Sequence, residues 1–314
     1  MLLSLTIIAP IFGLILIGYA SGRFGILSEA TGQGVADFTF ILAIPALLFR
    51  TIVKADFSQS DFLGVWGSFF LAAGATWVLA SLLTTTLLAR PTRDAPAISM
   101  SSAFGNTVML GLPLAVATFG DIATPTIALV LAIHAPTFWL TATIQQTFSE
   151  DTPSAEREPV AQALFRELGH NPIVLGISAG LIWRLTGVPL EGPIDEIVRL
   201  LAQAGIPAAL IALGLSLTKF QIAGQLPTLM TINALKLAAM PLIAWSLATY
   251  VFQLPPLTTG VVTILAAMPT GANAYLFAVR HNAAPASSSG AVALGTVLTV
   301  LTASAIITLL GSAS

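Results

Sequence analysis

Apolar segments of about 20 residues follow one another along almost the whole chain, and this succession constrains the fold more than any other feature. Of the 314 residues, 56% are hydrophobic and 8% are charged, whereas soluble domains carry roughly 25% charged residues. In hydrocarbon the backbone polar groups need partners inside the protein, so such segments form helices. The sequence therefore predicts an all-α integral membrane protein embedded in the lipid bilayer.

The chain has room for ten membrane-spanning helices and little else. The apolar segments are 3–21, 35–52, 62–88, 95–119, 124–147, 171–186, 194–217, 226–252, 257–280 and 285–310. A single long polar stretch, 148–169, divides them into five and five. An odd number of spans inverts the second half relative to the first. We therefore predict two inverted five-helix repeats, 1–147 and 170–314, joined by a cytoplasmic linker at 148–169.

Weak internal similarity agrees with an inverted repeat. Ile44-Pro45 in the second segment returns as Ile206-Pro207 in the seventh, at an offset of 162 residues.

Lys and Arg are in excess in cytoplasmic loops, and this asymmetry predicts the orientation. The loops predicted inside hold Arg23, Arg90, Arg93, Arg157, Arg166, Lys219 and Arg280, and those predicted outside hold Arg50, Lys54, Arg184 and Arg199. This balance predicts a multi-pass protein of the cell inner (plasma) membrane with both termini outside.

Two of the apolar segments, one in each half, are interrupted by glycine and proline. Gly111 and Pro113 lie in the fourth segment, and Pro269 and Gly271 lie in the ninth. Proline removes a backbone donor and obstructs the carbonyl four residues earlier, so both segments are predicted to be broken helices. A pair of interrupted segments at corresponding positions points to a transport site. The alternative is that these residues serve helix packing, as they do in many membrane helices.

Polar side chains beside the predicted breaks are the candidates for ligand binding. Asn106 and Asn273 can bind a carboxylate without placing a charge in the membrane, and Tyr275 offers a hydroxyl. The N-termini of the half-helices add partial positive charge. Together these groups suit a small organic anion. As the alternative, amide side chains also join membrane helices by hydrogen bonds.

Lys236 lies near the centre of the eighth segment, where a charge is costly and is a candidate for function. It could neutralise a substrate anion, take the place of a coupling cation or carry a proton. The alternative is a structural role, either in an ion pair or in a hydrogen bond to carbonyls of a broken helix.

The acids Asp37, Asp121 and Asp195 lie near segment ends, which disfavours a sodium site. His134 is a further titratable candidate, with a packing histidine as the alternative.

Several classes of function find no support. The chain has no cysteine, so disulfides and thiolate metal sites are excluded. The net charge of -2 provides no basic face for nucleic acid. No nucleophile elbow, zinc motif or P-loop is present. We predict neither enzymatic activity nor a cofactor.

The interrupted segments resemble the two broken helices of the auxin efflux carrier family. The resemblance is carried by Gly105-Asn106-Thr107 with Gly111-Leu112-Pro113-Leu114, and by Pro269-Thr270-Gly271-Ala272-Asn273-Ala274-Tyr275. Asn171-Pro172 and the pair Lys236 and Pro241 fit the bacterial branch of malate and malonate permease-like carriers.

The resemblance implies ten helices with a fold similar to the bile acid and sodium/proton carriers. Helices 1, 2, 6 and 7 would form a scaffold that makes a homodimer, and helices 3–5 and 8–10 a transport part. Pro113 and Pro269 would be the crossing prolines, with Asn106 and Asn273 beside the substrate. The expected function is secondary transport of a malate/malonate-like or auxin-like carboxylate by an elevator-type mechanism. The alternative is a membrane receptor or sensor that binds the same ligand without transport.

Overall fold

A computed structural model describes residues 2–55, 61–148, 171–222 and 224–311. These residues are helical apart from short connections, and they contain one isolated β-bridge and no β-strand. The all-α prediction is therefore confirmed for the part of the chain described. The predicted linker, 148–169, lies outside the described residues except for Phe148.

The helices follow the apolar segments closely. In chain order they are α1 (Leu2–Arg23), α2 (Glu29–Phe38), α3 (Ile44–Lys54), α4 (Phe62–Thr86), α5 (Ala95–Ala103), α6 (Leu112–Phe119), α7 (Thr124–Thr147), α9 (Pro172–Leu185), α10 (Gly192–Leu217), α11 (Leu226–Ala234), α12 (Met240–Ser246), α13 (Pro256–Ala266), α14 (Ala272–Arg280) and α15 (Pro285–Gly311). The π-helical segments Thr39–Ala43 and Leu235–Ala239 join α2 to α3 and α11 to α12, and Leu247–Val251 extends α12.

Among the described residues, 7 helices are long and apolar enough to cross a membrane. They coincide with seven of the predicted spans. The other three predicted spans contain shorter apolar helices, Thr107–Phe119, Pro172–Leu185 and Pro256–Ala266. Ten crossings and the inverted repeat therefore stay predictions.

Three prolines of the helical segments follow π-helical turns at a constant spacing, whereas Pro10, Pro136 and Pro207 lie within α-helices. Proline lacks an N–H and its ring collides with the carbonyl four residues earlier. In a π turn the backbone N–H donates to the carbonyl five residues earlier instead of four. This opens the helical hydrogen-bond pattern locally and makes room for the proline ring. In the described chain this occurs at Thr39–Ala43 before Pro45, at Thr107–Gly111 before Pro113 and at Leu235–Ala239 before Pro241. These prolines are thus built into continuous helices.

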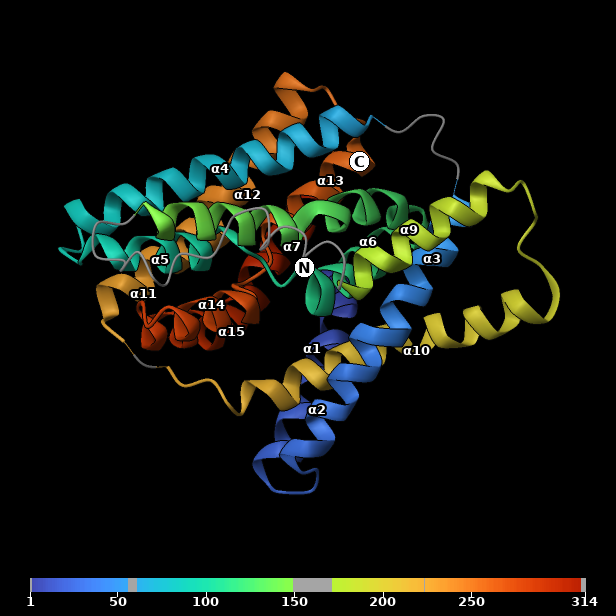
Figure 1. Cartoon of the computed structure of the whole chain (residues 1–314), viewed down its shortest axis with the longest axis horizontal. Helices are drawn as coiled ribbons and strands as arrows, with labels where there is room; N and C mark the ends of the chain where they lie inside the picture. The colour runs from blue at the N-terminus through green and yellow to red at the C-terminus, as the bar shows by residue number, and fades with distance from the viewer. Residues whose placement is uncertain (1, 56–60, 149–170, 223, 312–314) are drawn as a thin grey trace.

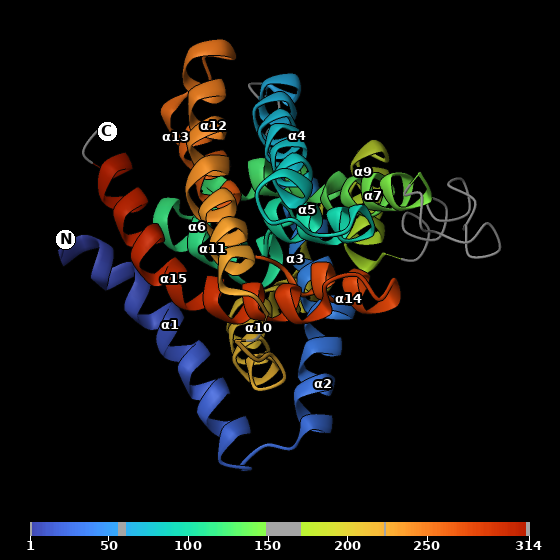
Figure 2. The ribbon, with the colours of Figure 1, turned by 90° about the vertical axis from the view of Figure 1, so that its left-hand side faces the viewer.

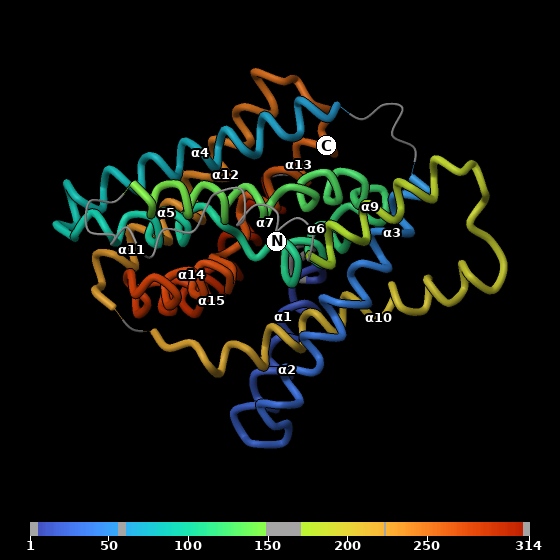
Figure 3. The backbone as a smooth tube through the Cα atoms, in the orientation of Figure 1, coloured from blue at the N-terminus to red at the C-terminus, as the bar shows by residue number. Residues whose placement is uncertain are grey.

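The helices pack as two groups. In the first, α1 lies along α10, and α3 lies against both α9 and α10. In the second, α4 packs on α5, α12 and α13, and α14 packs on α15. Figures 1 and 3 show α3, α9 and α10 at the right of the molecule and α5 and α11 at the left.

The contact between α1 and α10 is close because two glycines face it. A Cβ atom built on Gly214 would lie 2.1 Å from the Ile15 carbonyl oxygen, and one on Gly18 would lie 2.4 Å from the Ile211 carbonyl oxygen. Backbone approach of this kind is typical of small residues between membrane helices. The first group of helices is therefore held by tight backbone packing.

The two groups meet through α7, which contacts α3 and α9, and through α15, which lies beside α1 (Figure 2). Cavities between the helices lie along this boundary.

Candidate functional site

The two interrupted helices cross at their breaks. Helix α5 ends at Ala103 and the helix resumes at Thr107, while α13 ends at Ala266 and α14 begins at Ala272. Gly105 and Thr270 form an antiparallel bridge between the two breaks. The Asn106 N–H donates to the Pro269 carbonyl at 2.7 Å, and the Gly271 N–H donates to the Phe104 carbonyl at 3.0 Å. Each break thus satisfies backbone groups of the other, as a buried break in a membrane requires.

One of the two predicted break positions is wrong. Pro269 lies in the second break, as predicted, but the first break lies at 104–106 and not within a turn of Pro113. Pro113 is buried in α6, where the preceding π turn accommodates its ring. The crossing is therefore made by Gly105 against Thr270, and Pro113 is not a crossing proline.

Two other predicted site residues make packing contacts outside the cavity. A Cβ on Gly111 would lie 2.9 Å from Met268 Cγ, so this glycine lets one broken helix approach the other. The Tyr275 ring packs edge-on against Phe220, with centroids 5.3 Å apart. Neither Gly111 nor Tyr275 lines the cavity described next.

A cavity of about 580 Å³ lies beside the crossing, at the boundary between the two groups of helices. Residues 104–109 and 271–273, together with one face of α7, form its wall on one side. The N-terminal part of the α2–α3 helix, the start of α9 and the end of α10 form the other side. Asn106, Gly271 and Asn273 therefore come together, as residues of one cavity.

The two asparagines stand at the start of the resumed helices. Asn106 caps the segment that follows it, because its Oδ1 accepts from the Met109 N–H at 3.3 Å. Asn273 lies in the first turn of α14, and its half-buried side chain makes no hydrogen bond with the residues described. Both helix N-termini carry partial positive charge and unpaired N–H groups. Amide donors and two helix N-termini around one space are suited to a carboxylate.

Lys236 is fully buried at the crossing and does not line the cavity. Its Nζ donates to the Ala266 carbonyl at 2.7 Å and lies 3.1 Å from Met240 Sδ. A Cβ on Gly105 would lie 3.3 Å from the same nitrogen, so a side chain at this position would crowd the Lys236 ammonium. Of the alternatives given by the sequence, this geometry matches the hydrogen bond to a carbonyl of a broken helix.

The opposite wall of the cavity carries a carboxylate that the sequence analysis left without a role. Asp37 lines it from α2, and Gln33 Nε2 donates to Asp37 Oδ1 at 2.8 Å. Among the described residues that line this cavity, Asp37 is the one with a formal charge. No local pattern could have identified it, because α2 reaches the cavity only through its packing against α10.

His134 also lines the cavity, from α7. Its side chain is buried, and Nδ1 lies 3.5 Å from the Thr107 hydroxyl at the start of the resumed helix. The Phe104 and Phe138 ring centroids lie 4.5 Å and 4.9 Å from the imidazole. Nε2 has no hydrogen-bond partner among the described residues. The packing interpretation explains the aromatic contacts and leaves this nitrogen unexplained.

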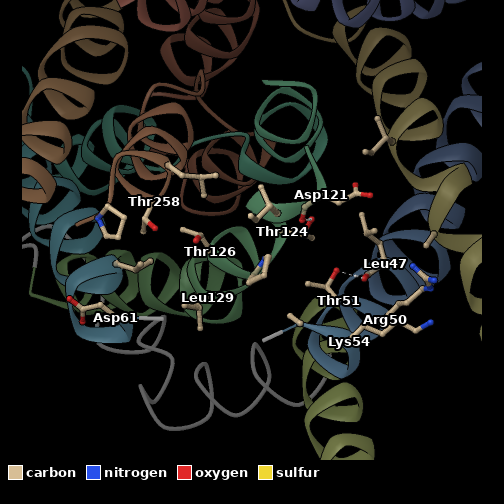
Figure 4. A pocket seen from close by; sticks show the side chains of 18 of the residues that line it. Leu47, Arg50, Thr51, Lys54, Asp61, Asp121, Thr124, Thr126, Leu129 and Thr258 are labelled. Atoms are coloured by element: carbon tan, nitrogen blue, oxygen red, sulfur yellow. Dashed lines mark hydrogen bonds between the residues drawn. The ribbon is translucent and has the colours of Figure 1, made fainter. Parts of the chain in front are cut away.

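A second cavity, of about 850 Å³, lies farther along the α2–α3 helix and nearer the starts of α7 and α10. Residues between 47 and 55 at the end of α3, the start of α7 and residues between 199 and 206 of α10 contribute to it. Figure 4 shows Arg50 and Lys54 on one side of this cavity and Asp61 on the opposite side. Arg50 Nε donates to Asp195 Oδ1 at 2.8 Å, and Lys54 bonds the other oxygen. These ion pairs join α3 to α10 within the first group of helices.

Comparisons with known proteins bear on this arrangement. The profile of a family described as "Membrane transport protein" matches residues 3–307. The chain is similar to a Rhizobium meliloti (strain 1021) protein named "Putative malonate transporter", with 23% identity over 98% of this chain and 95% of the relative. An "Uncharacterized transporter" of Methanothermobacter thermautotrophicus is 23% identical over 92% of both chains. The mouse "Lysosomal cholesterol signaling protein" is 23% identical over 54% of this chain, which spans 20% of that relative.

Proposed function

We propose, from the premise that this chain belongs to the membrane transport protein family, that it is a secondary carrier of an organic carboxylate. The motifs of the two interrupted helices had indicated the auxin efflux carriers, which this family includes. The observation that carries the proposal is the cavity in which Asn106, Asn273 and two helix N-termini meet. Such a site stabilises one carboxylate without a charged side chain of its own.

The lining of the cavity supports a monocarboxylate with an apolar body. Phe40, Ile173, Leu213, Phe220 and Leu276 supply apolar surface around it. A short dicarboxylate such as malonate would bring a second negative charge next to Asp37, with no lysine or arginine among the described lining residues. Two negative charges close together repel, and no cation on the described lining offsets the repulsion. The name of the Rhizobium relative points instead to malonate, so both substrates belong in the test.

The two cavities support movement by an elevator-type mechanism. They lie at opposite ends of the α2–α3 helix, beside residues 199–206 and 213–216 of α10, and next to each other along the first half of α7. Buried side chains of the first group, including Ile44 and Leu210, separate them along these helices. Translation of the broken helices against the first group would carry the asparagines from one cavity toward the other.

The architecture proposed with this mechanism follows the resemblance. It has ten crossings in two inverted repeats, with the helices of the first group as a scaffold that forms a homodimer. The second group is the transport part. The carrier lies in the inner membrane with both termini outside.

Lys236 has a distinct role in the proposal. Its ammonium lies where the ends of α5 and α13 bring partial negative charge together, which is a place where a cation is stabilised. We infer that this fixed charge replaces a coupling cation, so that transport needs no Na⁺.

Reconstitution tests the proposal directly. Purified protein in liposomes is given labelled malonate, malate or indole-3-acetate, with and without pH and Na⁺ gradients. We expect saturable uptake of indole-3-acetate that exceeds uptake of the dicarboxylates and does not depend on Na⁺. Uptake equal to that of protein-free liposomes for all three compounds would refute the carrier function.

A receptor or sensor that binds the same ligand is the second candidate. The observation in its favour is the similarity to a mouse protein whose name refers to signalling. The two functions separate in one preparation, because a sensor would bind a carboxylate in detergent and show no flux in liposomes.

A further inference from the structure

The His134 imidazole is the one feature of the cavity that neither the packing nor the carboxylate site explains. The residue is 2% exposed, yet Nε2 has no partner among the described residues. A buried polar atom without a hydrogen bond carries a desolvation cost and calls for an explanation. Because His134 contributes to the cavity wall, a bound molecule can supply the missing partner.

The position of the ring ties it to the carboxylate site. Thr107 follows Asn106 directly, and its hydroxyl lies 3.5 Å from His134 Nδ1. With the Nδ1 proton shared with that hydroxyl, the neutral ring presents the lone pair of Nε2 for a proton. The rings of Phe69, Phe104 and Phe138 pack around the imidazole.

No lysine or arginine is among the described residues that line the cavity beside the ring. Lys236 lies behind Gly105 and donates to Ala266, and Asp37 lies across the cavity. The other elements packed on α7 keep their charges away from His134. Arg50, Lys54 and Asp61 line the second cavity, Arg184 bonds carbonyls at the end of α3, and Asp94 pairs with Arg90 at the start of α5.

We propose that carboxylate binding loads one proton onto His134, so that the carrier moves the carboxylate and a proton together. This rests on the proposed function. Nε2 takes up a proton from the solution and keeps it, and the resulting N–H donates a hydrogen bond to a carboxylate oxygen in an imidazolium carboxylate pair. The site gains one negative and one positive charge, and its net charge does not change. On release the proton returns to the solution with the carboxylate.

Calorimetry in buffers of different ionisation enthalpy measures this proton uptake. Purified protein at pH 7.5 is titrated with indole-3-acetate and with malonate in phosphate and in Tris, and the buffer dependence of the heat gives the protons taken up per ligand. We expect about one proton per bound indole-3-acetate for the wild type. His134→Gln should bind several-fold more weakly, with uptake near zero.

Two controls keep the test independent of how well that variant folds. His281→Gln removes a histidine that lies outside the cavity and should leave the proton uptake unchanged. Indole-3-acetamide, which has the same body and no charge, should bind the wild type without proton uptake. Binding of indole-3-acetate or malonate with no proton uptake would overturn this inference and leave the proposed function intact. Binding of neither compound would overturn both.

Discussion

Replacing Asn273 with alanine should weaken carboxylate binding strongly and leave the fold intact. The amide lines the cavity from the first turn of α14, beside the N–H groups of that turn. A hydrogen bond to a charged group contributes about 1.5–3 kcal/mol. Since about 1.4 kcal/mol corresponds to a factor of ten, Kd should rise roughly 10- to 150-fold.

The structure predicts little effect of this substitution on stability. The Asn273 side chain makes no hydrogen bond with the described residues, so the variant leaves no partner unsatisfied. Alanine also has the higher helix propensity. The unfolding temperature of the empty Asn273→Ala protein should therefore equal or exceed that of the wild type.

A thermal-shift titration with indole-3-acetate in detergent measures both quantities in one experiment. Val279→Ala is the matched control, because Val279 lies on the same helix, is 49% exposed and does not line the cavity. Its Kd should match that of the wild type. An Asn273→Ala protein with a Kd within twofold of the wild type would place the carboxylate elsewhere and refute the reasoning.

Three further perturbations test separate parts of the structure. Gly214→Ala should lower the free energy of unfolding by about 1–3 kcal/mol, because the new Cβ would lie 2.1 Å from the Ile15 carbonyl oxygen. Gly13→Ala is the control and should leave thermal unfolding unchanged, because no atom lies within 4 Å of that Cβ position. Equal melting of these two variants would contradict the close α1–α10 contact. Asp195→Asn should lower the melting temperature modestly, since this carboxylate pairs with both Arg50 and Lys54 of α3. The Kd for the carboxylate should stay unchanged, and a loss of binding would give these ion pairs a role in the site. Lys236→Gln should reduce liposome uptake at least tenfold with a smaller effect on folding, and uptake by the wild type should not depend on Na⁺. A Lys236→Gln variant that transports as well as the wild type at all pH values would exclude the role proposed for the lysine.

Much of the fold was accessible from the sequence because membrane helices depend on local composition. Each apolar segment satisfies its own backbone hydrogen bonds, so hydropathy and the spacing of polar loops give the helix positions without knowledge of the packing. Glycine and proline likewise identified the two interrupted segments, and Asn106 and Asn273 were found beside them. These features reside in stretches of a few consecutive residues.

The exact place of the first break was not accessible in the same way. Pro113 was expected to break its helix, but a π turn accommodates it, as similar turns do before Pro45 and Pro241. A proline either breaks a helix or lies within a continuous one, and the outcome depends on which N–H donors reach the neighbouring carbonyls. Here the donors come from the other broken helix, more than 160 residues away: Asn106 bonds Pro269, and Gly271 bonds Phe104.

By itself, then, the sequence determined the membrane helices, the existence of two interruptions and the amides beside them. Only the tertiary structure decided what surrounds those amides. It placed the carboxylate of Asp37 across the cavity, held Lys236 on the Ala266 carbonyl and gave His134 Nε2 no partner among the described residues. These are contacts between segments distant in the chain, and the free energy of a charge or a polar atom in a membrane depends on the groups that such contacts bring near it.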